Sequence, residues 1–214
     1  MATVADTLDW AARRCSVMPP SSWISSTTAT ANEFKDFLNE VAEEILDRLD
    51  LPSPITKTAT MTSASSALPS DFLRLTRDDM AVFETTSVRR RCIPVNSDND
   101  WTYLNQIGSA GGHRYFRVEG DEDAGFTMDF YQALAAGDSI TVSYVSRNWL
   151  RTAGGVAGET WANADDVLLL PPPVVRLGVV WRFRQRKGLP YADILAEDDT
   201  RLSRAINDRR TIRS

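Results

Sequence analysis

Apolar residues recur at helical spacing near both ends of the chain, most clearly over residues 30–49. Successive apolar positions there lie three or four residues apart, which is the period of one helix face. The segment Thr30-Ala31-Asn32-Glu33 matches a capping box, and Pro52 and Pro54 follow the stretch. The pattern predicts an amphipathic helix that other helices must cover. Its apolar positions are Phe34, Phe37, Leu38, Val41, Ile45, Leu46 and Leu49.

A shorter helix is predicted at the amino terminus, over residues 4–17. Thr3 occupies the cap position and Asp6 the capping-box position three residues later. Pro19-Pro20 ends this helix, and the Ser/Thr-rich residues 21–30 predict a loop.

Between residues 55 and 145 the apolar period changes to two, which is typical of strands. Turn signals such as Leu68-Pro69-Ser70-Asp71 and Ala136-Gly137-Asp138 separate the runs. This spacing favours a small antiparallel sheet or sandwich over alternating parallel units. The strand-like runs are residues 56–62, 87–93, 115–119, 125–130 and 139–144.

Residues 147–166 predict a mobile loop because they are rich in glycine. A third helix is predicted after Pro171-Pro172-Pro173, since a proline is tolerated at the first helical position.

The third helix should end at a sharp corner, Lys187-Gly188-Leu189-Pro190. Gly188 suits the left-handed conformation of a helix C-cap, and Pro190 suits the start of a fourth helix over residues 190–208. The basic residues 209–214 are expected to fray in the isolated protein.

These elements predict an α+β protein, in which a helical bundle built from the N- and C-terminal helices carries an inserted antiparallel β region. The expected boundaries are 1–54 for the N-terminal helices, 55–150 for the β region, and 151–214 for the loop and the C-terminal helix pair. With 214 residues and 43% hydrophobic content, the chain can bury a substantial core.

Composition narrows the location of the protein. No run approaches the roughly 20 apolar residues that a membrane helix needs, and the amino terminus lacks the pattern of a signal peptide. We therefore expect no membrane association and synthesis in the cytoplasm of the producing cell. Cys15 and Cys92 lie far apart in different predicted element types, which favours two buried free thiols.

The net charge of −5 conceals a segregation of charge. Residues 33–50 carry seven acids against two bases, whereas every charge in residues 174–187 is basic. Solvated faces of helices that pack on one another would explain either run alone. An acidic surplus in one segment and a basic surplus in the other would also suit a subunit that binds the oppositely charged face of its neighbour.

The sequence offers no convincing catalytic or cofactor site. His113, the single histidine, falls in a predicted turn without the partners of a triad, and zinc would have too few ligands. Asp98-Asn99-Asp100 starts like a calcium loop but lacks the later ligands, so a solvated turn is favoured. The glycine clusters do not match phosphate-binding spacing. We expect no enzyme, no metal and no cofactor.

Nucleic-acid binding is suggested by the triplet Arg89-Arg90-Arg91 and by the basic C-terminal half. A pI near 5.0 opposes strong binding to phosphates, and alternation along a strand would split the triplet between two faces. Contact between subunits is the alternative role for the triplet.

Three segments resemble the head-to-tail adaptor proteins of tailed bacteriophages, also called connector or head-completion proteins. They are Leu68-Pro69-Ser70-Asp71-Phe72-Leu73-Arg74-Leu75, Asp138-Ser139-Ile140-Thr141-Val142-Ser143-Tyr144, and the stretch from Asp165-Asp166 through Leu177-Gly178-Val179-Val180-Trp181-Arg182 to Asp193. The order of the parts is similar as well: amino-terminal helices, a β region, and a carboxy-terminal helix pair.

The resemblance implies a structural virion protein at the head-tail junction, without enzymatic activity. It would form a ring, typically of twelve copies, below the portal protein, extend the channel for genomic DNA without sequence-specific binding, and provide the platform for a downstream tail or neck protein.

Two sets of charged residues are candidates for contacts in such a ring. Acidic residues of the second helix would face the lumen or a neighbouring subunit, and basic residues of the last two helices would face the portal or a neighbour. The acidic set is Glu33, Asp36, Glu40, Glu43, Glu44 and Asp47. The other set is Arg176, Arg182, Arg184, Arg186, Lys187, Tyr191, Arg201, Arg204, Arg209, Arg210 and Arg213.

Two alternatives stay open. One is a neck or tail-completion protein one layer further down. The other is a ligand-binding β module on a helical stalk, suggested by the aromatic residues Trp101, Tyr103, Tyr115 and Phe116 near predicted turns.

Overall fold

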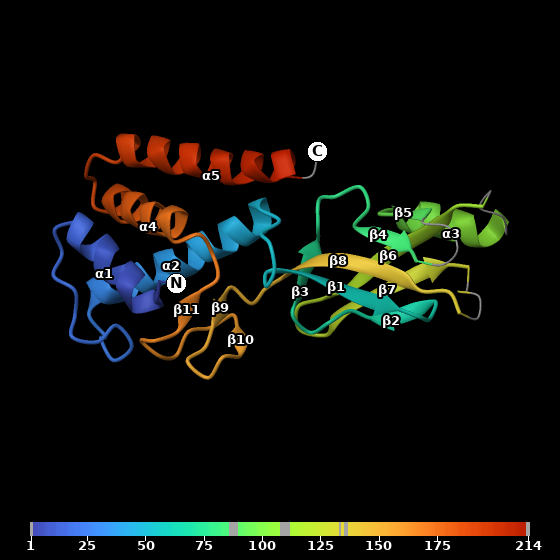
Figure 1. The fold of residues 1–214 in the computed structure, drawn as a ribbon, viewed down its shortest axis with the longest axis horizontal. Helices are drawn as coiled ribbons and strands as arrows, with labels where there is room; N and C mark the ends of the chain where they lie inside the picture. The colour runs from blue at the N-terminus through green and yellow to red at the C-terminus, as the bar shows by residue number, and fades with distance from the viewer. Residues whose placement is uncertain (1, 86–89, 108–111, 133, 135–136, 213–214) are drawn as a thin grey trace. The chain divides into compact units, whose positions relative to one another are not determined.

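The computed structural model is α+β and separates into two compact units, Met1–Leu51 with Asn148–Ser214, and Pro52–Arg147 (Figure 1). It describes all residues except 1, 86–89, 108–111, 133, 135–136 and 213–214, and only the backbone of residues 206–212.

The first unit contains the helices α1 (Val4–Arg14), α2 (Ala29–Arg48), α4 (Pro172–Arg186) and α5 (Ala192–Ile212). Helix α4 packs against the other three. This central position explains why α4 is apolar on most sides and lacks the single apolar stripe of a surface helix. Its buried residues are Val174, Val175, Leu177, Gly178, Val179, Val180 and Phe183.

The predicted start of α1 is confirmed, and that of α2 is shifted. At α1, the Thr3 hydroxyl accepts from the Asp6 backbone N–H at 3.0 Å and the capping box is complete, although the helix ends at Arg14 and not near residue 17. At α2, Thr28 and not Thr30 is the cap, accepting from the Ala31 N–H at 3.3 Å. The earlier hydroxyl takes the cap position, and the predicted capping box lies inside the helix.

Residues 147–166 contain short strands where a loop was expected. The short strands β9 (Leu150–Arg151), β10 (Ala157–Gly158) and β11 (Val167–Leu168) form a sheet of order β10-β9-β11. The amino terminus pairs with this sheet through an isolated bridge between Thr3 and Val167. The loop prediction missed these strands because strands of two residues leave no periodic pattern, and the mobility of the segment stays a prediction.

The second unit is built around one sheet of eight strands. Seven follow the order β1-β8-β4-β5-β6-β7-β2, and β3 pairs with β8 off this path. The edge strands β1 and β2 are joined by only three residues, 62–64. So short a link requires the sheet to curl until its two edges approach each other. The strands are β1 (Thr56–Met61), β2 (Ser65–Ala67), β3 (Phe72–Leu75), β4 (Val82–Glu84), β5 (Arg90–Pro94), β6 (Arg114–Asp121), β7 (Gly125–Tyr131) and β8 (Ile140–Ser146).

The sheet is mixed, so the expectation of a wholly antiparallel β region was wrong. Strand β5 pairs parallel with β6, from Cys92 opposite Arg114 to Pro94 opposite Phe116. Helix α3 (Asp98–Ile107) provides the crossover that a parallel pair needs. It begins where Asp98-Asn99-Asp100 was expected to form a turn; the acids Asp98 and Asp100 lie in its first turn, where they favour a helix start.

The corner between α4 and α5 has the expected geometry at its glycine. Gly188 adopts φ +67°, and the Leu189 N–H donates to the Arg184 carbonyl at 2.8 Å. Helix α5 begins at Ala192, two residues later than predicted, and its backbone stays helical to Ile212, where fraying was expected.

Candidate functional site: the polar network of α2, α4 and α5

Helices α2 and α4 approach closely because α4 carries a glycine at the contact. A Cβ atom added at Gly178 would lie 2.8 and 2.9 Å from the two Cγ atoms of Val41. Further along the two helices, the rings of Phe34 and Phe183 stack with their centroids 4.5 Å apart. This close approach places the polar side chains of both helices within reach of one another.

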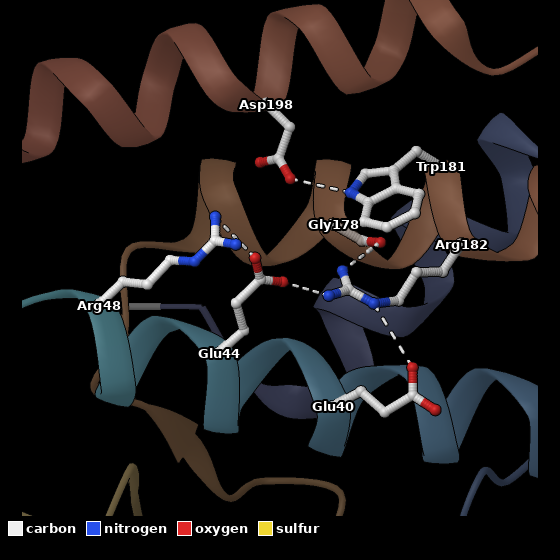
Figure 2. A network of polar contacts seen from close by, with 7 residues as sticks. All are labelled: Glu40, Glu44, Arg48, Gly178, Trp181, Arg182 and Asp198. Carbon is white, nitrogen blue, oxygen red and sulfur yellow. Dashed lines mark hydrogen bonds and ion pairs between the residues drawn. The ribbon is translucent and has the colours of Figure 1, made fainter.

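Arg182 of α4 is the centre of that polar network (Figure 2). Its guanidinium pairs with Glu44 of α2, contacts Glu40 at 3.4 Å and donates to the Gly178 carbonyl at 3.2 Å. Glu44 also pairs with Arg48 at 2.8 Å. The Arg182 side chain is only 12% exposed and lies over the Trp181 ring at 4.3 Å. Its charge is thus engaged within the subunit.

Helix α5 joins the network through a half-buried carboxylate, that of Asp198. The Trp181 indole N–H donates to Oδ2 of Asp198 at 3.0 Å, and among the described residues Oδ1 has no hydrogen-bond partner (Figure 2). Burial raises the pKa of Asp198 to about 6; Glu44 and Asp199 add to this, and Trp181 and Arg182 oppose it. The charge of Asp198 therefore titrates near neutral pH at the contact that holds α5.

The corner after α4 contributes two further contacts inside the first unit. Lys187 pairs with Glu33 of α2 at 2.7 Å, and its ammonium lies 5.5 Å from the Phe183 ring centroid. Arg184 donates to the carbonyls of Arg14 and Pro190, both at 3.3 Å. Several of the charges predicted to face a neighbour thus meet each other within one chain.

The rest of the predicted acidic set lies on the outer face of α2. Asp36, Glu40, Glu43 and Asp47 are exposed and follow one another at intervals of four, three and four residues. That spacing places them in one stripe along the helix. The stripe contains no basic residue, and the nearby Lys35 donates to the Ser26 carbonyl at 2.7 Å.

The remaining predicted basic residues are spread over the two C-terminal helices. Arg176 lies over Trp10 of α1 at 5.7 Å, and Arg201 pairs with Glu197 on its own helix at 2.8 Å. Arg186 and Arg204 are exposed, and Tyr191 is half-buried. The side chains of Arg209 and Arg210, and all of Arg213, lie outside the described residues.

One organising residue that the sequence did not reveal is Asp71, in the segment Leu68-Pro69-Ser70-Asp71. Its carboxylate accepts from Lys57 of β1 at 2.5 Å, and from Ser146 and Tyr144 of β8 at 2.7 and 3.0 Å. Burial alone would raise its pKa, but these hydrogen bonds, that of Lys57 foremost, lower the pKa of Asp71. The turn signal in the sequence predicted a turn at Asp71, but it did not reveal that Asp71 joins this turn to β1 and β8.

Asp166 has the corresponding role in the first unit. It is fully buried, and its carboxylate accepts from the backbone N–H groups of Ala153, Ala162 and Asn163 at 2.8 to 2.9 Å. Burial would raise its pKa, yet the three backbone donors outweigh burial and lower it. Asp166 thereby fixes the backbone of residues 153–166.

The aromatic residues that suggested a ligand site are mostly used in packing. Phe116 is buried in the core of the second unit, and Trp101 stacks with Arg117 at 4.7 Å and packs against Tyr131. Tyr115 packs in the same cluster as Trp101, and Tyr103 is exposed.

Other candidate chemistry is likewise explained by the fold. His113 is exposed, and no group of metal-binding side chains occurs among the described residues. Cys15 and Cys92 are buried free thiols, as predicted. Of the basic triplet, Arg89 lies outside the described residues, and Arg91 pairs with the exposed Asp79 at 3.4 Å. Within the part of the chain that the structure describes, no helix is long and apolar enough to span a membrane.

The fold and this network define a class: an α+β protein in which polar side chains hold helices together. The model of one family, described as SU10 adaptor protein, matches residues 2–213, and the chain belongs to that family. It is therefore a bacteriophage adaptor protein, as the resemblance in the sequence indicated. The family is one of structural proteins of the head-tail junction. No curated protein sequence matches the chain.

Proposed function

We propose that this protein forms a ring below the portal, extends the channel for genomic DNA and provides the platform for the next tail component. The observation that carries the proposal is the adaptor family match over residues 2–213. Because the match covers both compact units, we assign the function to the whole chain.

In this proposal the four helices of the first unit act as a bundle into which the β unit is inserted. The pairs of Arg182 with Glu44 and of Lys187 with Glu33 would keep each subunit rigid. The acidic stripe of α2 would then face the lumen or a neighbouring subunit. Closed rings are built from such repeated contacts between different faces of identical subunits, in this family typically twelve of them.

We further propose that the basic segment 209–214 binds the portal. Three of its six residues are arginine, so it complements an acidic surface. Deletion of residues 209–214 is expected to lower the affinity for purified portal at least tenfold and to leave the far-UV spectrum almost unchanged. Unchanged portal affinity would refute this assignment.

The alternative position is a neck or tail-completion layer further from the head. Chemical cross-linking in assembled particles separates the two positions. Cross-links to the portal support the adaptor ring, whereas cross-links to tail components without any to the portal support the lower layer.

A further inference from the structure

We propose that a groove between α1 and α4 receives the acidic stripe of α2 from a second copy of this chain. This inference rests on the proposed ring and assigns the two faces that would meet in it. The groove has a volume of about 690 Å³ and is lined by Trp10, Arg13, Arg14 and Arg176, together with Asp6 and Asp9.

The two carboxylates of the groove are already engaged. Asp9 accepts from the Trp23 indole N–H at 2.7 Å and pairs with Arg13 at 3.5 Å. Asp6 completes the capping box of α1 with Thr3. Arg13 is therefore balanced by Asp9 of its own helix. Arg14 and Arg176 exceed the remaining carboxylate, Asp6, and leave the groove with a net positive charge.

Arg14 and Arg176 have no carboxylate partner among the described residues. The Arg176 Nε atom is buried without a hydrogen-bond partner in the same part of the chain, and its guanidinium lies 5.7 Å from the Trp10 ring centroid. Trp10 itself is 37% exposed. An exposed tryptophan beside two arginines that lack carboxylates is the composition of an interface centre, and the preferred ligand of the arginines is a carboxylate.

The stripe of α2 supplies the matching chemistry. Asp36 and Glu43 are exposed and have no basic partner among the described residues, while Glu40 keeps a 57% exposed side chain beside Arg182. Like charges at this spacing destabilise a helix by about 0.2–0.5 kcal/mol per pair. Arginines of a second copy would remove this repulsion. We therefore expect the acidic stripe to bind the groove of another copy of the chain.

The stripe and the groove are different faces of the helical unit. The stripe lies along an exposed flank of α2, from which Glu40 reaches Arg182 of α4, and the groove lies between α4 and α1. A contact between two different faces is heterologous, and repetition of such a contact produces rings or filaments. A two-fold dimer would instead use the same face twice.

Charge reversal tests this assignment. The groove variant Arg14→Glu with Arg176→Glu, and the stripe variant Asp36→Lys with Glu43→Lys, each bring like charges together. Each variant alone is expected to weaken self-association about 100-fold or more, because like charges facing each other cost several kcal/mol. Sedimentation velocity at low ionic strength, over a range of concentrations, measures the effect.

The decisive sample is a 1:1 mixture of the two variants. In it, each reversed face meets a complementary one, so association is expected to return to the wild-type level. The matched control Glu122→Lys with Asp123→Lys changes the net charge as the stripe variant does, but on an exposed turn of the second unit. It should associate like the wild type.

Three outcomes would overturn the inference: a wild-type protein that stays monomeric at its highest soluble concentration, a variant that associates normally, or a mixture that does not associate. Binding to purified portal is measured on the same samples. Normal portal binding together with one of these three outcomes refutes the assigned faces and leaves the proposed function standing, whereas a wild-type protein that does not bind the portal refutes that function.

Discussion

Two aspartates show how single residues fix each unit. Asp71 joins a turn to strands β1 and β8 through three side-chain donors, and Asp166 holds a loop through three backbone donors. Both lie in segments that carried the resemblance to phage adaptors. Their role is structural, because a carboxylate that accepts from three donors orders the chain around it.

Asp71→Asn is expected to lower the free energy of unfolding by about 2–3 kcal/mol, because an amide keeps one acceptor oxygen and turns an N–H₂ group toward Lys57. Urea denaturation at pH 7 measures the loss. The control Asp79→Asn should change stability by less than about 0.5 kcal/mol, because the Asp79 side chain is 85% exposed. Equal effects in the two variants would contradict the role of Asp71.

The pH dependence follows from the lowered pKa of Asp71. Its ionised form is stabilised in the folded state, so its contribution is fully present above the ordinary carboxyl pKa near 4 and is lost as the pH falls below that value. Asp71→Asn should therefore flatten the acid limb of the stability curve, and an unchanged acid limb would show that other carboxylates dominate it.

The residue type at position 178 is also dictated by its neighbours, because only glycine leaves room for Val41. Gly178→Ala should cost about 1–3 kcal/mol through contact with Val41, partly offset by about 1 kcal/mol of helix propensity. A net loss of about 1 kcal/mol is expected in thermal or urea unfolding. In a Val41→Ala background the same change should be neutral or stabilising, since the Cγ atoms in conflict are gone. The same loss in both backgrounds would exclude this explanation.

At the scale of elements, α5 is held to α4 by a contact that depends on ionisation. The Asp198 carboxylate is half-buried, accepts one hydrogen bond from Trp181 and faces Glu44 and Arg48 of α2, Arg182 of α4, and Asp199 of its own helix. Since its pKa is raised to about 6, the docked helix binds a proton more tightly than the separated one, for which the pKa is near 3.8. Docking is therefore strongest in acid and weakens as the pH rises through 6.

Hydrogen exchange of α5 amides, corrected for the intrinsic rate, should show about tenfold more protection at pH 5 than at pH 7.5. The factor is smaller than the full pKa shift implies, because the Asp198 carboxylate of the separated helix is already ionised at pH 5. Asp198→Asn keeps an acceptor for Trp181 and removes the charge, so it should make protection high at both pH values. A pH response that persists in this variant would refute the role of Asp198.

Elements with strong periodicity could be predicted from the sequence, and elements defined by tertiary contacts could not. The helices around Leu38 and Val179 and the strands around Phe130 and Val142 were recognised because each buries one face or a whole apolar run. Strands of two residues, the parallel pairing of β5 with β6, and helix α3 left no periodic signal of their own. The partners of the charged residues were the hardest feature to predict, since sequence alone does not say whether Arg182 pairs with Glu44 of its own chain or with another subunit.

At the scale of the whole molecule, pairing within the chain sorts the charged residues into two groups. Glu33, Glu44, Arg182 and Lys187 hold the helical unit together. Asp36 and Glu43 of the stripe, and Arg14 and Arg176 of the α1–α4 groove, are the charges proposed to contact a second copy. A subunit that presents complementary faces in this way is suited to assembly, which is the function proposed for this adaptor.

Electron microscopy of the protein incubated with purified portal tests the central claim most directly. The account predicts closed rings stacked coaxially on the portal, with the helical unit of each subunit against its neighbours and a continuous central channel. Portals without added density, in the presence of excess adaptor that remains monomeric, would contradict it.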